Sequence, residues 1–214
     1  MIEIRKIYYP TVLEQIPNIY DDNVDVIFTF DNNISLSIVF STPQNIVTLM
    51  ENENKPYLPI GLPQIYVKKL DYEIIERAIY SYISNEDLFC KYYMNDYSIF
   101  LNKFNMEKIK NIEYFTRNDD TYKTNKDVVD VAIEFNNNKK VHSLFCTPEY
   151  LSNYFVKENT SFLPIGLPPI FVKEINDKTI KEALNNYIGN SEDNNINFFF
   201  QYFSDNLLNL KKQD

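Results

Sequence analysis

The chain has 214 residues, and 44% of them are apolar, which is enough to bury a core in one large or two small domains. Its formal charge of −9 and isoelectric point near 4.7 argue against nucleic-acid binding, which needs clustered lysine and arginine. An acidic chain instead suits a basic partner, although many proteins are acidic for solubility alone.

We expect neither a signal peptide nor a membrane span in this sequence. Residues 1–5 lack the basic segment followed by an apolar run that marks a secretory signal. No stretch reaches the roughly 18 uninterrupted apolar residues of a transmembrane helix. Cys90 and Cys146 have no metal-type spacing and are expected to be reduced thiols. These features predict a cytoplasmic protein that does not enter membranes.

A tandem repeat organises the sequence. The segment Leu-Pro-Ile-Gly-Leu-Pro occurs at residues 58–63 and again at residues 163–168. Aligning residue n with residue n+105 matches 24–83 with 129–188 without a gap, and 24 of these 60 positions are identical. We therefore expect two copies of one structural unit.

Each copy is expected to begin with a strand. Residues 2–9 alternate between apolar and polar side chains, and a similar stretch begins at Asn111. The connections that follow, residues 10–23 and 116–128, differ from each other in sequence and length. We expect these connections to be irregular.

A β-hairpin is the clearest pattern in each copy. Apolar and polar residues alternate over 24–30 and over 129–135, which predicts that one face of each strand is buried. Asparagine-rich turns follow, and asparagine tolerates the left-handed conformations of tight turns. The return strands are expected at 34–40 and 139–145.

Two helices are expected in each copy. The Thr-Pro pairs at 42–43 and 147–148 predict helix starts, because threonine can accept a bond from an unpaired N–H and proline needs none. Asp71 and Asn176 are expected to cap the second helix of each copy. Between the helices, the proline-bearing segment predicts a rigid bend and then a strand, at 65–68 in the first copy.

Each copy thus has the pattern β-β-β-α-β-α, an α+β arrangement of mainly antiparallel sheets with helices packed on one face. We assign residues 1–105 to the first repeat and 106–214 to the second, as a pseudo-symmetric pair or one compact domain. Aromatic segments at 87–94 and 198–203 predict a further helix after each repeat.

Catalytic and cofactor motifs are not recognisable. The single histidine, His142, has no nucleophile context, which favours a surface residue. Each Leu-Pro-Ile-Gly-Leu-Pro segment has one glycine, which favours a structural turn over a phosphate loop. Glu73 and Glu76 fit a solvated helix surface better than an acid–base pair. We therefore predict no enzyme activity, no cofactor and no metal ion.

The pattern carried by Thr42-Pro43, Thr147-Pro148, Leu58–Val67 and Leu163–Val172 resembles small bacterial immunity proteins of polymorphic or contact-dependent toxin systems. The likeness covers both of the aligned stretches. It implies an acidic, cytoplasmic, cofactor-free protein that binds and occludes a cognate toxin. Duplication departs from the single-unit form of such proteins, so the repeat that would face a toxin is left open.

Acidic residues near the unlike connections are the candidate partner-binding residues, namely Asp21, Asp22, Asp25, Asp119 and Asp120. The alternative interpretation is a solvated acidic surface. The expected partner is a toxin protein with a basic surface, with no nucleic acid and no membrane involved.

Two other classes of function stay open. One is an uncharacterised enzyme with a site between the two repeats. The other is a structural protein that forms a homodimer through an exposed sheet edge or through the aromatic C-terminal segment.

Overall fold

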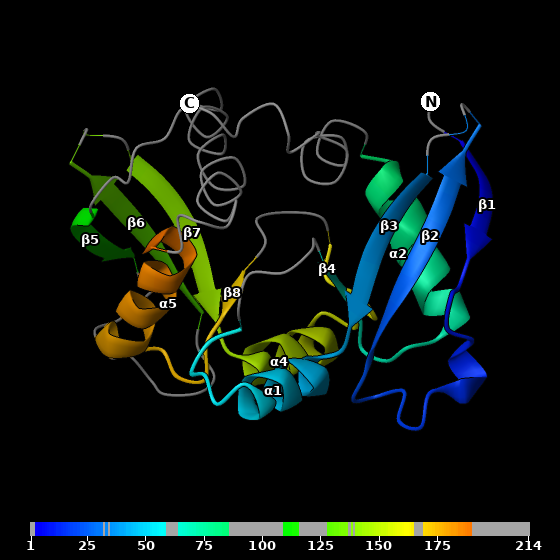
Figure 1. The fold of residues 1–214 in the computed structure, drawn as a ribbon, viewed down its shortest axis with the longest axis horizontal. Coiled ribbons are helices and arrows are strands. Elements are labelled where there is room, and N and C mark those ends of the chain that lie inside the picture. The colour runs from blue at the N-terminus through cyan, green and yellow to red at the C-terminus, as the bar shows by residue number, and fades with distance from the viewer. Residues whose placement is uncertain are drawn as a thin grey trace. The chain divides into compact units, whose positions relative to one another are not determined.

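The computed structural model of the chain describes residues 3–31, 33, 35–58, 64–85, 109–115, 128–136, 138, 140–164 and 169–189. Within them, helices accompany two four-stranded sheets with mostly antiparallel pairing (Figure 1). This arrangement confirms the predicted α+β class. The aromatic segments at 87–94 and 198–203 and most of the predicted bend at 58–63 lie outside the described residues.

Both halves of the chain have the same order of strands and α-helices. In the first half the elements are β1 Ile4–Tyr8, the short 3₁₀ helix η1 Leu13–Gln15, β2 Asn23–Phe30, β3 Ser35–Ser41, α1 Pro43–Asn52, β4 Gln64–Tyr66 and α2 Tyr72–Ile83. In the second half they are β5 Ile109–Phe115, β6 Val128–Phe135, β7 Lys140–Cys146, α4 Pro148–Lys157, β8 Ile170–Phe171 and α5 Asp177–Gly189. Apart from η1, each half reads β-β-β-α-β-α.

The strand order is the same in both sheets, β1-β2-β3-β4 and β5-β6-β7-β8. The first three strands of each sheet pair with one another antiparallel, and the fourth strand is parallel to the third. A parallel pair needs a crossover connection, which the helices α1 and α4 provide. Strands β1 and β5 therefore lie at the edges of their sheets.

Strand β5 begins two residues before the predicted start at Asn111. Ile109 pairs with Phe135 and Asn111 pairs with Glu134, so the intervening Lys110 is an extra residue in the ladder. The same irregularity occurs in β1 between Ile4 and Lys6. A bulge breaks the apolar–polar alternation, which explains why the sequence pattern missed the start of β5.

Local sequence signals account for the turns and the helix starts. Asn33 and Asn138, in the hairpin turns, have φ angles of 65° and 63°, as the asparagine pattern predicted. The hydroxyl oxygens of Thr42 and Thr147 accept bonds from backbone N–H groups three residues later, at 3.3 and 3.2 Å. Asn176 caps α5 by accepting the N–H of Thr179 at 2.9 Å. These predicted caps are confirmed.

The core of each sheet is built by the predicted alternation. The alternate apolar side chains on the core face of β2 are at most 2% exposed, and their counterparts on β6 are equally buried: Val24, Val26, Phe28, Phe30, Val129, Val131, Ile133 and Phe135. Helices α2 and α5 contribute the buried stripes Ile75, Ala78, Ile79 and Ile180, Ala183, Leu184. Burial of such side chains is the main stabilising contribution, at about 25 cal/mol per Å² of apolar surface.

The compact units of the structure do not follow the sequence repeats everywhere. Residues 54–58, from the first repeat, group with the strands of the second sheet. Residues 151–164, from the second repeat, group with the strands of the first sheet. Each unit therefore includes a short segment that belongs to the other repeat in the sequence.

Backbone hydrogen bonds hold these exchanged segments. In the second unit, the N–H of Leu58 donates to the carbonyl of Phe171 at 2.9 Å, and the N–H of Lys173 donates to that of Pro56 at 2.8 Å. Tyr57 forms an antiparallel bridge with Val172 between them. The segment thus pairs along β8 on the side away from β7.

The first unit contains the same pairing with the repeats reversed. The N–H of Leu163 donates to the carbonyl of Tyr66 at 2.9 Å, and the N–H of Lys68 donates to that of Ser161 at 2.8 Å. All four of these residues lie 105 positions from their counterparts in the second unit. The exchange is reciprocal, and it leaves β1 and β5 as the sheet edges without such a segment among the described residues.

Candidate functional site

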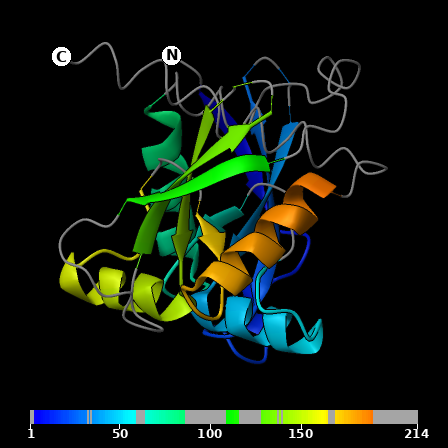
Figure 2. The same ribbon diagram turned by 90° about the vertical axis from the view of Figure 1, so that its left-hand side faces the viewer.

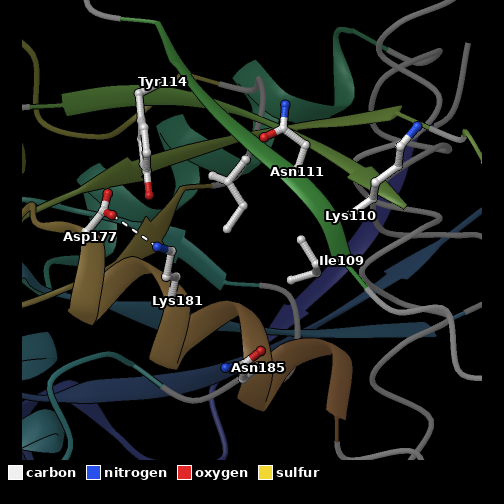
Figure 3. Close-up of a pocket in the computed structure, with 8 residues that line it drawn as sticks. Ile109, Lys110, Asn111, Tyr114, Asp177, Lys181 and Asn185 are labelled. Atoms are coloured by element: carbon white, nitrogen blue, oxygen red, sulfur yellow. Dashed lines mark hydrogen bonds and ion pairs between the residues drawn. The ribbon is translucent and has the colours of Figure 1, made fainter. Parts of the chain in front are cut away.

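A groove lies between the edge strand β5 and helix α5 in the second unit (Figure 3). Its volume is about 420 Å³, and eight residues line it: Ile109, Lys110, Asn111, Ile112, Tyr114, Asp177, Lys181 and Asn185. Figure 2 turns β5 (bright green) and α5 (orange) toward the viewer.

Helical spacing places three polar side chains along one side of the groove. Asp177, Lys181 and Asn185 recur every four residues, so they lie on one face of α5. The neighbouring stripe of Ile180, Ala183 and Leu184 is buried. Because that stripe fixes the rotation of α5 about its axis, the polar side chains face β5.

The other side of the groove comes from β5. Ile112 pairs with Ile133 and Tyr114 with Val131, and these partners are fully buried, so both β5 side chains point to the core face of the sheet. They are half-buried because β5 is at the sheet edge. Tyr114 points toward the start of α5 in Figure 3.

Asp177 is the one acidic residue among those that line the groove. Hydrogen bonds from Tyr114 and Lys181 lower the pKa of the Asp177 carboxyl, which is therefore ionised at neutral pH. The Lys181 ammonium lies 3.0 Å from the carboxylate. Both side chains remain more than half exposed, so they are accessible from the groove.

Lys110 is directed to a different set of acceptors. Its ammonium donates to Glu134 at 2.7 Å and to Asn138 at 3.1 Å, and Figure 3 shows it pointing away from α5. The hydrogen bond from Lys110, and then the nearby Lys140, lower the pKa of the Glu134 carboxyl. Lys110 shares Glu134 with Lys140, and Lys181 is the lysine that faces the groove interior.

The corresponding place in the first repeat has different chemistry. Tyr9 is equivalent to Tyr114, and it packs edge-on against Tyr72 with ring centres 4.8 Å apart. Tyr72 is the equivalent of Asp177, so the first repeat has a ring where the second has a carboxylate. Burial, and then the nearby Glu76 charge, raises the pKa of Tyr9.

Tyr72 also forms hydrogen bonds with the connection after β1. Its hydroxyl accepts from the N–H of Leu13 at 3.1 Å and donates to Glu14 at 2.9 Å. Asp177 in the second repeat has a shorter side chain and bonds within the groove instead. The two repeats have therefore diverged at the surface between the edge strand and the helix.

Two of the five sequence-predicted acidic residues bond to α1 or to its cap residue Thr42. Asp21 accepts a bond from the Thr48 hydroxyl at 2.8 Å. The Asp22 carbonyl accepts from the N–H and the hydroxyl of Thr42, and its carboxylate accepts from Asn23. The Asp21 side chain therefore contacts α1, whereas Asp22 contacts Thr42 through its backbone carbonyl.

The other three predicted residues are separated from this cluster or outside the described part. Asp25 is exposed on β2, opposite Val39 of β3. Asp119 and Asp120 lie outside the described residues. The structure thus brings Asp21 and Asp22 together, and it does not place the second-repeat pair.

The sequence pattern did not single out the groove. A comparison of the two repeats could have indicated it. The buried stripe of the second helix stays apolar in both repeats, but three residues on the neighbouring face differ: Tyr72, Glu76 and Tyr80 in the first repeat are Asp177, Lys181 and Asn185 in the second. Such differences show where one helix face changed its chemistry. Only the structure shows that this face borders an edge strand.

The described residues contain no group of three or more His, Cys, Asp or Glu side chains that could hold a metal ion. Cys146 is 2% exposed, and burial raises the pKa of its thiol. His142 is half-buried on β7, opposite Ala132. No helix among these residues is long and apolar enough to cross a membrane.

Comparisons with protein-family models, with curated proteins and with solved structures found no match to the chain.

Proposed function

We propose that the chain is a non-catalytic binding protein of the cytoplasm, an immunity protein that binds and neutralises a cognate toxin. The observation that carries the proposal is the groove between β5 and α5, because an edge strand beside a helix can hold a polypeptide segment. An edge strand offers backbone N–H and C=O groups to another chain. Side chains from the helix then give selectivity.

The charge of the chain supports a basic protein as the partner. A net charge of −9 attracts cationic surfaces and speeds their association. Most toxins that act on nucleic acids need positive charge to hold phosphate, so an acidic inhibitor complements them. The resemblance carried by Thr42-Pro43 and Thr147-Pro148 points to the same class of protein.

The proposal is tested with the product of the adjacent upstream gene. The two proteins are co-expressed, purified through a tag on the upstream product, and measured by calorimetry and by cell survival. We expect a one-to-one complex and rescue of growth. Growth arrest that the chain does not relieve, with no complex by calorimetry, would contradict the proposal.

Self-association is a second candidate, because β1 and β5 are edge strands. Such an edge can pair with the edge of a second copy. Light scattering over a range of concentrations separates the two candidates. A mass that stays that of one 25.4 kDa chain at the highest concentration argues against a homodimer.

A further inference from the structure

We propose that the two repeats are joined through a self-recognition surface, which also pairs the repeats of two copies of this chain. Each repeat offers a short extended segment, residues 56–58 or 161–163, and accepts the segment of the other repeat beside β8 or β4. The inference concerns a second copy of this chain, and it does not depend on the proposed binding of a toxin.

The backbone contacts are the same on both surfaces. Each segment forms two backbone hydrogen bonds, of 2.9 and 2.8 Å, with the strand that accepts it and the residues after that strand. Each also forms one antiparallel bridge, Tyr57 with Val172 and Phe162 with Val67. Backbone pairing does not depend on which polypeptide supplies the segment, as strand addition by separate chains shows.

The side chains at the two surfaces are also closely matched. Three equivalent positions carry identical residues: Leu58 and Leu163, Val67 and Val172, Lys68 and Lys173. The bridging residue of the segment is aromatic in both repeats, as Tyr57 or Phe162. An exchanged segment therefore meets the same backbone and side-chain pattern in every copy of the chain.

Burial shows that the pairing removes apolar surface from water. Tyr57 and Leu58 are 8% and 7% exposed, and Val67 and Val172 are 0% exposed. A repeat without a partner would expose part of this surface. Covering it again favours association with another repeat, whichever chain that repeat comes from.

The covalent connection between the repeats decides which copy supplies the segment. Joining two binding modules in one chain raises the concentration that each experiences, commonly to the millimolar range. A dilute intact chain therefore pairs its own repeats. When the connection is cut, repeats from different chains compete on equal terms, and exchange of an identical element between copies has a low energetic cost.

The test uses the full-length protein with a protease site, flanked by glycine–serine spacers, inserted between residues 105 and 106. The folded protein is cleaved and then measured by light scattering during gel filtration at low micromolar concentration. We expect one particle that contains both halves and has the mass of the uncut variant.

A mixing experiment tests pairing between copies. One cleaved sample carries an affinity tag on its first repeat, and a second cleaved sample is untagged and isotope-labelled. Equal amounts are unfolded together in urea, refolded and captured through the tag. Mass spectrometry should find labelled and unlabelled second repeats in equal amounts on the tagged first repeats.

Two substitutions at one position locate the interaction. Leu58→Pro removes the N–H that donates to Phe171, whereas the control Leu58→Ala also loses the leucine side chain but keeps this N–H. Dilution of the cleaved variants measures the dissociation constant of the two halves. Leu58→Pro should raise this constant at least about fivefold more than Leu58→Ala does, because the carbonyl of the buried Phe171 loses its donor.

The reciprocal pair, Leu163→Pro and Leu163→Ala, should rank in the same order, since the N–H of Leu163 donates to Tyr66. Halves that separate after cleavage would overturn the inference, as would tagged first repeats that hold only second repeats of their own sample. Equal dissociation constants for the proline and alanine variants would also overturn it, because something other than the exchanged segments would then join the repeats. These measurements contain no toxin, so their outcome is independent of the co-expression experiment.

Discussion

The hydroxyl of Tyr82, near the end of α2, donates a hydrogen bond of 2.7 Å to the backbone carbonyl of Leu163. The two residues are 81 positions apart, and they belong to different sequence repeats but to the same compact unit. Tyr82 is only 3% exposed. This contact holds the exchanged segment against a helix, in addition to its pairing with Tyr66 of β4 and the residues that follow it.

We expect Tyr82→Phe to lower the free energy of unfolding by about 1 kcal/mol, because it removes one buried hydrogen bond and leaves the carbonyl to other donors. Urea denaturation followed by circular dichroism measures the change. Tyr80→Phe is the matched control, since its side chain is on the same helix and 56% exposed. Equal effects of the two substitutions would show that the hydroxyl of Tyr82 contributes nothing specific.

The reciprocal exchange predicts that the chain unfolds in one cooperative transition. Each compact unit contains a segment of the other repeat, so neither unit is complete when the other repeat is unfolded. Ile75→Ala and its equivalent Ile180→Ala remove side chains that are 0% exposed, and each should cost about 2–5 kcal/mol. Both variants should shift the same single transition to lower urea concentration.

Hydrogen exchange resolved by peptide fragment distinguishes this outcome from independent unfolding. In the cooperative case, Ile75→Ala speeds exchange in β6 as much as in β2, and Ile180→Ala does the same. Two transitions, each sensitive to only one of the substitutions, would contradict the role given to the exchanged segments.

Local signals made much of the fold predictable from the sequence. The alternation in β2 and β6, the Thr-Pro helix starts and the Asp71 and Asn176 caps each depend on residues close in the chain. Such interactions are readable because one residue type satisfies one local backbone requirement. The bulge at Lys110 was missed because an extra residue disturbs the period of two.

The candidate site was not predictable in the same way. Asp177 and Tyr114 are 63 positions apart in the sequence, and their proximity depends on how α5 packs across the sheet. Of the acidic residues favoured by the sequence, Asp21 accepts a bond from Thr48 within α1, and Asp22 accepts one from Thr42 through its backbone carbonyl. Charge alone did not distinguish a binding carboxylate from a structural one.

Ser143 offers a test of core packing in the second unit. It is 1% exposed on the core face of β7, and none of the described residues provides a hydrogen-bond partner for its hydroxyl. The equivalent residue of the first repeat is Ile38, which is equally buried. We expect Ser143→Val to raise the free energy of unfolding by about 1–2 kcal/mol, because it removes a buried polar group and adds apolar volume.

The control for this substitution is Ser143→Thr, which has nearly the shape of valine but keeps the hydroxyl. Thermal and urea denaturation of the two variants are compared side by side. An equal gain in both would attribute the effect to the added methyl group alone. A loss of stability in Ser143→Val would mean that the site does not accept apolar volume as the Ile38 site does.

Asp71 predicts a difference in acid stability between the caps of α2 and α5. Bonds from Lys69, and then from the N–H groups of Ile74 and Glu73, hold the pKa of the Asp71 carboxyl below its ordinary value. A carboxyl whose pKa is lowered by folding stabilises the protein above its unfolded pKa of about 3.9, and this contribution is lost as pH falls through the lower folded value. The free energy of unfolding of the wild type, minus that of Asp71→Asn, should therefore decrease only below about pH 4.

Asparagine caps helices as well as aspartate does, as Asn176 does for α5, so Asp71→Asn should change stability at neutral pH by less than about 1 kcal/mol. Asp71→Ala removes the cap and should cost about 1 kcal/mol at neutral pH. The reciprocal variant Asn176→Asp should introduce an acid-dependent contribution at α5. Urea denaturation from pH 2 to pH 7 measures all three. If the difference in free energy of unfolding between the wild type and Asp71→Asn does not vary with pH, the lowered pKa of Asp71 does not contribute to stability.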